Sequence, residues 1–160
     1  MFIENSNDLN SAIEKNRDWK VGVVVSEYYS EIISNLLLGV DKALENLHLP
    51  KTYDLYKVPG AFEIPLMCKK IINKYDALIT LGVVIKGDTD HYKYVCQKCA
   101  DGIMEVQLEN GKPIIFEVLM VKKIEDALKR ADIENYNNNK GFEALMSVYR
   151  TLTSIKRAIK

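Results

Sequence analysis

The chain has 160 residues, of which 48% are hydrophobic and 28% charged, with 22 basic side chains balancing 22 acidic ones. These values are typical of one globular domain, and we expect a single domain over residues 1–160 with an N-terminal arm at residues 1–19. The zero net charge disfavours a nucleic-acid partner, because binding to a phosphate backbone needs clustered, uncompensated cations.

Predicted strands and helices alternate along the chain. A β-branched run at residues 21–25 precedes apolar residues at helical spacing from Ile32 to Leu44, which predicts a buried strand and an amphipathic helix. Three more strands are predicted at 53–58, 77–85 and 114–121. Further helices are predicted after Pro59-Gly60, from Thr89 to about Glu109, at 124–131 and from Phe142 to Leu152.

This order, βαβαβαβαα, predicts a parallel sheet with right-handed crossovers and helices on both faces. Ligands of such sheets bind beyond the carboxyl ends of the strands, near the point where the strand order reverses. The first three strand ends carry the residues 26–29 (SEYY), 58–63 (VPGAFE) and 86–91 (KGDTDH). Aromatic rings, a carboxylate, a glycine turn and a histidine are therefore expected at one crevice.

The glycine turn after the third strand is better suited to binding a phosphate group than to binding a nucleoside triphosphate. Gly82 and Gly87 have the spacing of a P-loop, but Asp88 stands where that motif needs Lys. Free N–H groups and the helix dipole at a helix start near Thr89 suit a phosphate group. A simple N-cap explains the same residues equally well. His91 follows in the first turn of this helix and is expected to face the same crevice. The alternative is a histidine that only packs in the core or lies on the surface.

The three cysteines indicate packing in a reducing compartment. Cys96 and Cys99 have the spacing of a redox or zinc pair, but they lie inside a predicted helix and no second pair completes four ligands. Apolar runs are far shorter than the roughly 20 residues that span a bilayer, and the first residues, MFIENSNDLN, do not resemble a secretion signal. We expect a cytoplasmic protein with reduced thiols, no metal and no membrane partner.

Three segments resemble the 6,7-dimethyl-8-ribityllumazine synthase family: residues 58–65 (VPGAFEIP), 81–92 (LGVVIKGDTDHY) and 139–144 (NKGFEA). The resemblance covers roughly residues 21–155. It implies a flavodoxin-like three-layer α/β/α fold with a four-stranded parallel sheet in the order 2-1-3-4. It also implies an enzyme of riboflavin biosynthesis that condenses 5-amino-6-(D-ribitylamino)uracil with 3,4-dihydroxy-2-butanone 4-phosphate, releases phosphate and water, and uses no cofactor.

The resemblance implies a role for residues at both ends of the site. Asp88 and Thr89 would form the phosphate cradle, Arg130 would reach the phosphate, and Lys140 would supply a second cation across a subunit boundary. His91 would shuttle protons, which suits the unperturbed pKa of about 6.5 of a histidine. The remaining implied pyrimidine and ribityl contacts are Tyr28, which would stack on the pyrimidine, Ala61, Phe62, Glu63, Val83, Val84 and Phe116.

Some positions depart from the family's pattern. Glu27 and Tyr29 stand where the family usually has Arg and Asn, and Glu117 and Met120 replace a usual Gly and Thr.

Two other functions stay open. An archaeal-type riboflavin synthase shares the fold but is disfavoured by the match at residues 86–91. A non-catalytic flavin- or lumazine-binding shell protein is supported only by Glu27 and Tyr29.

The segment between Arg130 and Lys140 bears on assembly. It spans ten positions, two more than is usual in the family, and it ends in three asparagines that predict a solvated loop and a helix N-cap. The resemblance places this segment near contacts between pentamers, where closed shells generally have a shorter form with glycine. We predict a homopentamer of about 90 kDa, with a decamer and then a sixty-subunit shell as the alternatives.

Overall fold

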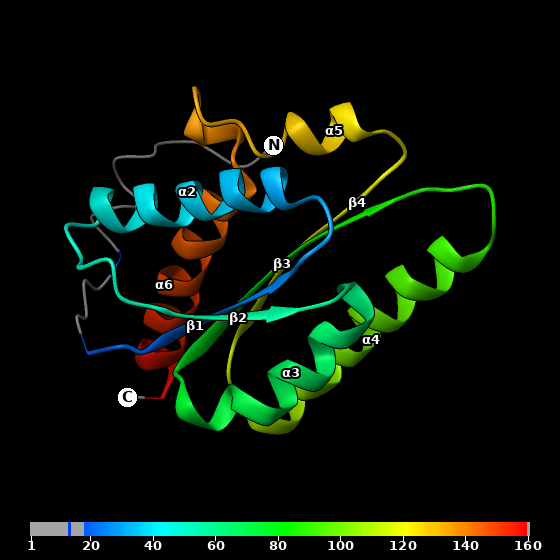
Figure 1. Ribbon diagram of the computed structural model, residues 1–160. Helices are drawn as coiled ribbons and strands as arrows, with labels where there is room; N and C mark the ends of the chain where they lie inside the picture. Colours follow the sequence, from blue (N-terminus) through cyan, green and yellow to red (C-terminus); the bar gives the residue numbers. More distant parts are fainter. Residues whose placement is uncertain (1–12, 14–17, 160) are drawn as a thin grey trace.

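The computed structural model describes residue 13 and residues 18–159 (Figure 1). Most of the predicted N-terminal arm, residues 1–12 and 14–17, lies outside the described residues. No described helix is both long enough and apolar enough to cross a membrane. In chain order the elements are β1 (Val21–Ser26), α2 (Ser30–Asn46), β2 (Asp54–Val58), η1 (Ala61–Glu63), α3 (Ile64–Ile71), η2 (Ile72–Lys74), β3 (Ala77–Ile85), α4 (His91–Asn110), β4 (Ile114–Val121), α5 (Ile124–Leu128), η3 (Tyr136–Asn138) and α6 (Lys140–Ala158).

The four strands form one parallel sheet in the order β2-β1-β3-β4. Figure 1 shows α2 and α6 on one face of this sheet and α3 and α4 on the other. The predicted three-layer α/β/α fold and its strand order are therefore confirmed.

The central strands β1 and β3 are apolar except for Ser26 and Thr80, because helices cover both of their faces. Val23 and Val25 pack into the core beneath α2 and α6, while Val24 packs into the core beneath α3 and α4. Leu36 of α2 and Ile64 of α3 are fully buried in these two cores. Burying one such side chain contributes roughly 1.5 to 3 kcal/mol, so the two cores hold both helix layers against the sheet.

The last helix, predicted from Phe142 to Leu152, extends from Lys140 to Ala158, and two further helix boundaries differ from their predictions. The helix predicted at 124–131 ends at Leu128, because the chain beyond Arg130 makes an antiparallel bridge between Ala131 and Asn139. The helix predicted from Thr89 begins at His91, whose backbone N–H donates to Thr89 Oγ1 at 3.4 Å. Thr89 therefore lies just before the helix and not in its first turn.

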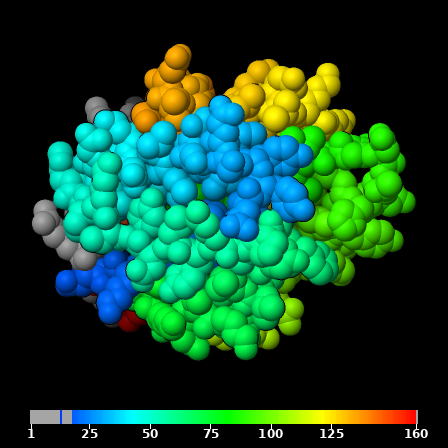
Figure 2. Space-filling model, in the orientation of Figure 1, coloured from blue at the N-terminus to red at the C-terminus, as the bar shows by residue number. Residues whose placement is uncertain are grey.

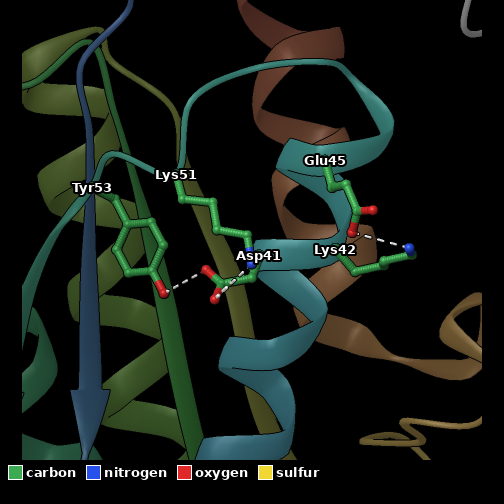
Figure 3. Close-up of polar contacts among 5 residues, drawn as sticks. All are labelled: Asp41, Lys42, Glu45, Lys51 and Tyr53. Atoms are coloured by element: carbon green, nitrogen blue, oxygen red, sulfur yellow. Dashed lines mark hydrogen bonds and ion pairs between the residues drawn. The ribbon is translucent and has the colours of Figure 1, made fainter.

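The connection from α2 to β2, at the edge where the strands begin, is fastened by a small polar cluster (Figure 3). The Tyr53 hydroxyl donates to Asp41 Oδ1 at 3.1 Å, and Lys51 Nζ lies 3.6 Å from Asp41 Oδ2. Burial, together with the negative charge and the hydrogen bond of Asp41, raises the pKa of Tyr53 to about 12. Tyr53 therefore stays protonated and remains a donor throughout the ordinary pH range.

Asn139 joins the start of α6 to the segment after α5 and to α2, which is distant in the sequence. Its Oδ1 accepts the N–H groups of Gly141 at 2.9 Å and Phe142 at 3.3 Å, as expected of an N-cap. Its Nδ2 donates to Asn35 O at 3.0 Å and Asp132 O at 3.1 Å. The predicted N-cap is confirmed, but Asn139 is only 1% exposed and so does not belong to a solvated loop.

Glycine at 141 is required by the same junction. A Cβ placed there would lie 1.8 Å from the Leu36 carbonyl oxygen of α2. Such a contact is far inside van der Waals distance, so any larger residue would push α6 away from α2. The close approach of these two helices therefore depends on the sequence Asn139-Lys140-Gly141.

Tyr29 precedes α2 in a left-handed conformation, with φ 58° and ψ 51°. This region is unfavourable for a bulky side chain but tolerable for asparagine, whose short polar group bonds locally. Asparagine is the residue that the resemblance leads one to expect here. Tyr29 therefore has a strained backbone conformation in the turn between β1 and α2.

Asn139→Ala is expected to lower the free energy of unfolding by about 2 to 4 kcal/mol, because it removes an N-cap and leaves two backbone carbonyls without their donor. Asn137→Ala, at an exposed neighbouring asparagine, is the control and should change stability by less than about 0.5 kcal/mol. Urea unfolding at one protein concentration measures both. Equal effects would show that the Asn139 side chain does not hold the junction.

Tyr29→Asn is expected to raise the free energy of unfolding by about 0.5 to 1 kcal/mol, because asparagine adopts the left-handed region at lower cost. Tyr29→Ala removes the ring but keeps a Cβ in that region, so it should give no gain. Urea unfolding of the two variants separates relief of strain from loss of an exposed ring. A gain in the alanine variant alone would contradict this explanation.

Candidate active site

The loops after β1, β2 and β3 meet at the carboxyl edge of the sheet, on the right of Figure 1. The Glu27 N–H donates to Val58 O at 2.9 Å and joins the first two loops. In Figure 2 the blue surface at the start of α2 adjoins the blue-green surface of the segment that follows β2. The helix α4, which follows the third loop, packs against η1. The strand order thus gathers these loops in one place.

Gly60 brings an aromatic ring and a carboxylate together. A Cβ at Gly60 would lie 3.6 Å from a ring carbon of Tyr28 and 3.1 Å from Glu63 Oε2. The Gly60 N–H donates to the same Oε2 at 2.9 Å, which fixes the Glu63 carboxylate at the end of β2. The structure therefore places Tyr28 and Glu63 on either side of one glycine.

Aromatic side chains near this edge are exposed to an unusual degree. Tyr28 is 67% exposed and Phe62 is 57% exposed, while Phe116, in the first half of the edge strand β4, is 37% exposed. Exposed aromatic rings offer flat apolar faces on which another ring can stack. At the end of β3, Val83 is buried in the core beneath α2 and α6, and Val84 is half-buried against the core beneath α3 and α4, so this strand end is apolar on both faces.

The turn between β3 and α4 exposes backbone donors. Residues 86–91 are all exposed, and the N–H groups of Asp88 and Thr89 make no hydrogen bond among residues 18–159. The N–H of His91, two residues after Thr89, donates to Thr89 Oγ1 where the helix begins. Free N–H groups before a long helix are suited to an anion. His91 is the first residue of α4 and is exposed beside this turn.

Arg130 and Lys140 form a second group, here called the cation pair. The Lys140 N–H donates to Arg130 O at 2.8 Å, and the Ala131–Asn139 bridge continues this short ladder. The Arg130 guanidinium donates to Asp126 O at 2.8 Å, and Lys140 Nζ lies 2.5 Å from Glu143 Oε2. In the described part of the chain, no hydrogen bond or ion pair joins the cation pair to Tyr28, Glu63, Thr89 or His91.

The predicted residues thus fall into two groups in one chain. Among the described residues, no hydrogen bond joins Phe116 or the cation pair to the loops after β1, β2 and β3. The other group, here called the strand-end cluster, consists of Tyr28, Ala61, Phe62, Glu63, Val83, Val84, Asp88, Thr89 and His91.

Glu117 is a charged residue near the cation pair to which the sequence analysis assigned no role. Burial raises the pKa of this carboxyl to about 7, with the charge of Lys140 lowering the pKa and the charge of Glu143 raising it. That Glu117 replaces the glycine usual in the family is visible in the sequence. Its effect on titration is not, because it depends on the packing of α6 against β4.

The cysteines behave as packing groups. Cys68 and Cys99 are buried and Cys96 is half-buried, and all are free thiols. Burial raises the pKa of Cys68 and of Cys99 to about 12, so neither is a thiolate at neutral pH. Over residues 18–159 no group of three or more His, Cys, Asp or Glu side chains is placed to hold a metal ion.

Comparison with known proteins identifies the family. The family model for 6,7-dimethyl-8-ribityllumazine synthase matches residues 18–156. A Streptomyces coelicolor protein named 6,7-dimethyl-8-ribityllumazine synthase is 37% identical over 140 residues, which cover 87% of this chain and 86% of the relative. A protein of the same name from Limosilactobacillus reuteri is 41% identical over 120 residues, covering 74% of this chain and 78% of the relative. The chain belongs to the 6,7-dimethyl-8-ribityllumazine synthase family.

Proposed function

We propose that this chain condenses 5-amino-6-(D-ribitylamino)uracil with 3,4-dihydroxy-2-butanone 4-phosphate to give 6,7-dimethyl-8-ribityllumazine, phosphate and water. The observation that carries the proposal is the exposed Tyr28 ring beside the fixed Glu63 carboxylate at Gly60. This pair is suited to binding a polar heteroaromatic ring that carries a hydroxylated substituent. The polypeptide that contains it matches the family over residues 18–156.

The pyrimidine substrate is assigned to the loops after β1 and β2. Tyr28 stacks on the ring, and Glu63, held by the Gly60 N–H, accepts from hydroxyl groups of the ribityl chain. Ala61 and Phe62 complete this wall from η1. The apolar sides are assigned to Val83, Val84 and Phe116.

The four-carbon phosphate is assigned to the turn before α4. The free N–H groups of Asp88 and Thr89 face an anion, and Arg130 supplies a guanidinium. A charge-assisted hydrogen bond of this kind contributes roughly 1.5 to 3 kcal/mol. Lys140, whose backbone N–H donates to Arg130 O, is assigned as a second cation to the pyrimidine and ribityl side of the site.

The catalytic work is mostly positioning. The amine and the ketone are reactive by themselves, and holding them in register supplies about 7 kcal/mol or more. Imine formation, phosphate elimination and ring closure then each require a proton to move. His91 is assigned this proton transfer because it lies at the start of α4 beside the phosphate turn.

The division into a strand-end cluster and a cation pair supports a site shared between two copies. The cation pair of one copy would complete the strand-end cluster of its neighbour, which requires a homo-oligomer. An exposed apolar stripe on α4, formed by Tyr94, Met104 and Leu108, offers a surface for such contacts. We propose a ring of five 18.3 kDa chains, about 90 kDa, with a decamer or a sixty-subunit shell as the larger alternatives.

A cytoplasmic location is part of the proposal. It is supported by the three free thiols, since unpaired cysteines are typical of a reducing compartment. The substrates are small and the described residues require no metal for the chemistry assigned to them.

Incubation of the purified chain with both substrates tests the function. Lumazine fluorescence should appear only when both substrates are present. Formation of riboflavin from lumazine alone would instead support the archaeal-type riboflavin synthase activity. Tight binding of riboflavin without product formation would support a non-catalytic binding protein.

Arg130→Ala is expected to raise the KM for 3,4-dihydroxy-2-butanone 4-phosphate roughly ten- to a hundredfold, because the phosphate loses a charge-assisted partner. The KM for the pyrimidine should change little. Lys129→Ala removes an exposed cation from the adjacent position and is the matched control. Steady-state kinetics with each substrate varied in turn decide the matter, and equal changes in both KM values would count against the assignment.

A further inference from the structure

One buried hydroxyl of the sheet lacks a hydrogen-bond partner. Of the four polar side chains buried in the described part of the chain, Thr80, Asn139 and Thr153 are hydrogen-bonded. The fourth, Ser26, is 1% exposed, and within residues 18–159 its hydroxyl oxygen neither meets a hydrogen-bonding atom nor reaches solvent. An unpaired buried hydroxyl lowers the stability of the free protein, so its presence here calls for a physical reason.

Ser26 is the last residue of β1 and lies at the carboxyl edge of the sheet. The next residue, Glu27, donates its N–H to Val58 O at 2.9 Å. The segment after Val58 forms η1, which packs against β1 and β3. Because side chains alternate along a strand, Ser26 lies on the same face as Val24, toward α3 and α4. The hydroxyl is therefore at the base of the loops to which the pyrimidine substrate is assigned.

Gly82 of β3 leaves room for this hydroxyl. A Cβ placed at Gly82 would lie 3.2 Å from Ser26 Oγ, 3.1 Å from Val118 Cγ1 and 3.3 Å from Ile64 Cδ1. The side-chain atoms gathered at this point are thus apolar except for the hydroxyl itself. The free protein offers Ser26 no side-chain partner there, and a larger residue at position 82 would crowd the hydroxyl.

We propose that the Ser26 hydroxyl is a binding group for the pyrimidine substrate: it turns toward the strand-end cluster and donates a hydrogen bond to a carbonyl oxygen of the bound ring. A serine hydroxyl has three staggered positions, so this turn needs no movement of the backbone. The hydroxyl that is unpaired in the free protein gains a partner in the complex, which favours binding. This inference rests on the proposed function, because it takes the loops after β1 and β2 as the pyrimidine site.

Urea unfolding of the free protein compares Ser26→Ala with Thr80→Val. Thr80 lies on the same face of β3 as Gly82, but its hydroxyl donates to Ile115 O at 3.1 Å. Thr80→Val keeps the shape of the side chain and should lower the urea midpoint, because a hydrogen bond is lost. Ser26→Ala should leave the midpoint unchanged or raise it, because no bond is lost. A fall as large as that of Thr80→Val would contradict the proposal.

Calorimetric titration with 5-amino-6-(D-ribitylamino)uracil measures pyrimidine binding without the second substrate. Ser26→Ala should raise the Kd roughly three- to tenfold, as expected for the loss of a hydrogen bond between neutral groups. Thr80→Val should keep the Kd of wild type. In steady-state kinetics, the KM for the pyrimidine should rise by a similar factor in Ser26→Ala, while kcat and the KM for the phosphorylated substrate should change little.

Ser26→Cys provides a second test if the alanine variant folds poorly. Cysteine has a side chain of similar shape, but its S–H group is a weak donor. The affinity for the pyrimidine should therefore fall in this variant as well. A wild-type Kd in Ser26→Cys would show that the binding does not depend on a strong donor at this position, and the proposal would be wrong.

The outcomes separate the inference from the function. If wild type binds the pyrimidine but forms no lumazine, the proposed function fails, and the Kd values still decide the role of Ser26. If lumazine forms but wild type and Ser26→Ala bind the pyrimidine equally well, the function stands and the role of Ser26 is overturned. An equal rise of both KM values would also overturn it, because the hydroxyl would then not be specific to the pyrimidine.

Discussion

The Asn139 side chain is the junction on which the arrangement of the cation pair depends. Its four hydrogen bonds fix the start of α6 against α2 and against the segment after α5. The next residue, Lys140, then reaches Arg130 O with its backbone N–H. Two cations ten positions apart in the sequence are thus held side by side, and Glu117 of β4 lies near the second of them.

The strands were predictable because their apolar runs are continuous and bounded by turn residues. The bounds predicted for β3 and β4 agree with the structure. The end of α5 was not predictable from helical periodicity, because a bridge to Asn139 ends it. The burial of Asn139 was equally hidden, since one of its partners, Asn35, lies 104 positions away.

The candidate site was predictable only in part for similar reasons. Parallel topology brings strand ends to one edge, so the residues after β1, β2 and β3 could be named from the sequence. The pairing of Arg130 with Lys140 depends on the path of the chain after β4, which spacing alone does not reveal. The left-handed backbone of Tyr29 and the raised pKa of Glu117 depend on local geometry that spacing does not encode.

The central claim is that one copy's cation pair completes the strand-end cluster of its neighbour. Co-expression of two impaired chains tests it, with 3,4-dihydroxy-2-butanone 4-phosphate kept well below the KM of the arginine variant: Arg130→Ala carries an intact strand-end cluster, and a Phe62→Ala, Glu63→Ala double variant carries an intact cation pair. Random mixing leaves about a quarter of shared sites with two intact halves. The account predicts that the mixed oligomer regains about a quarter of wild-type lumazine formation; activity no higher than the mean of the two separate variants would contradict it.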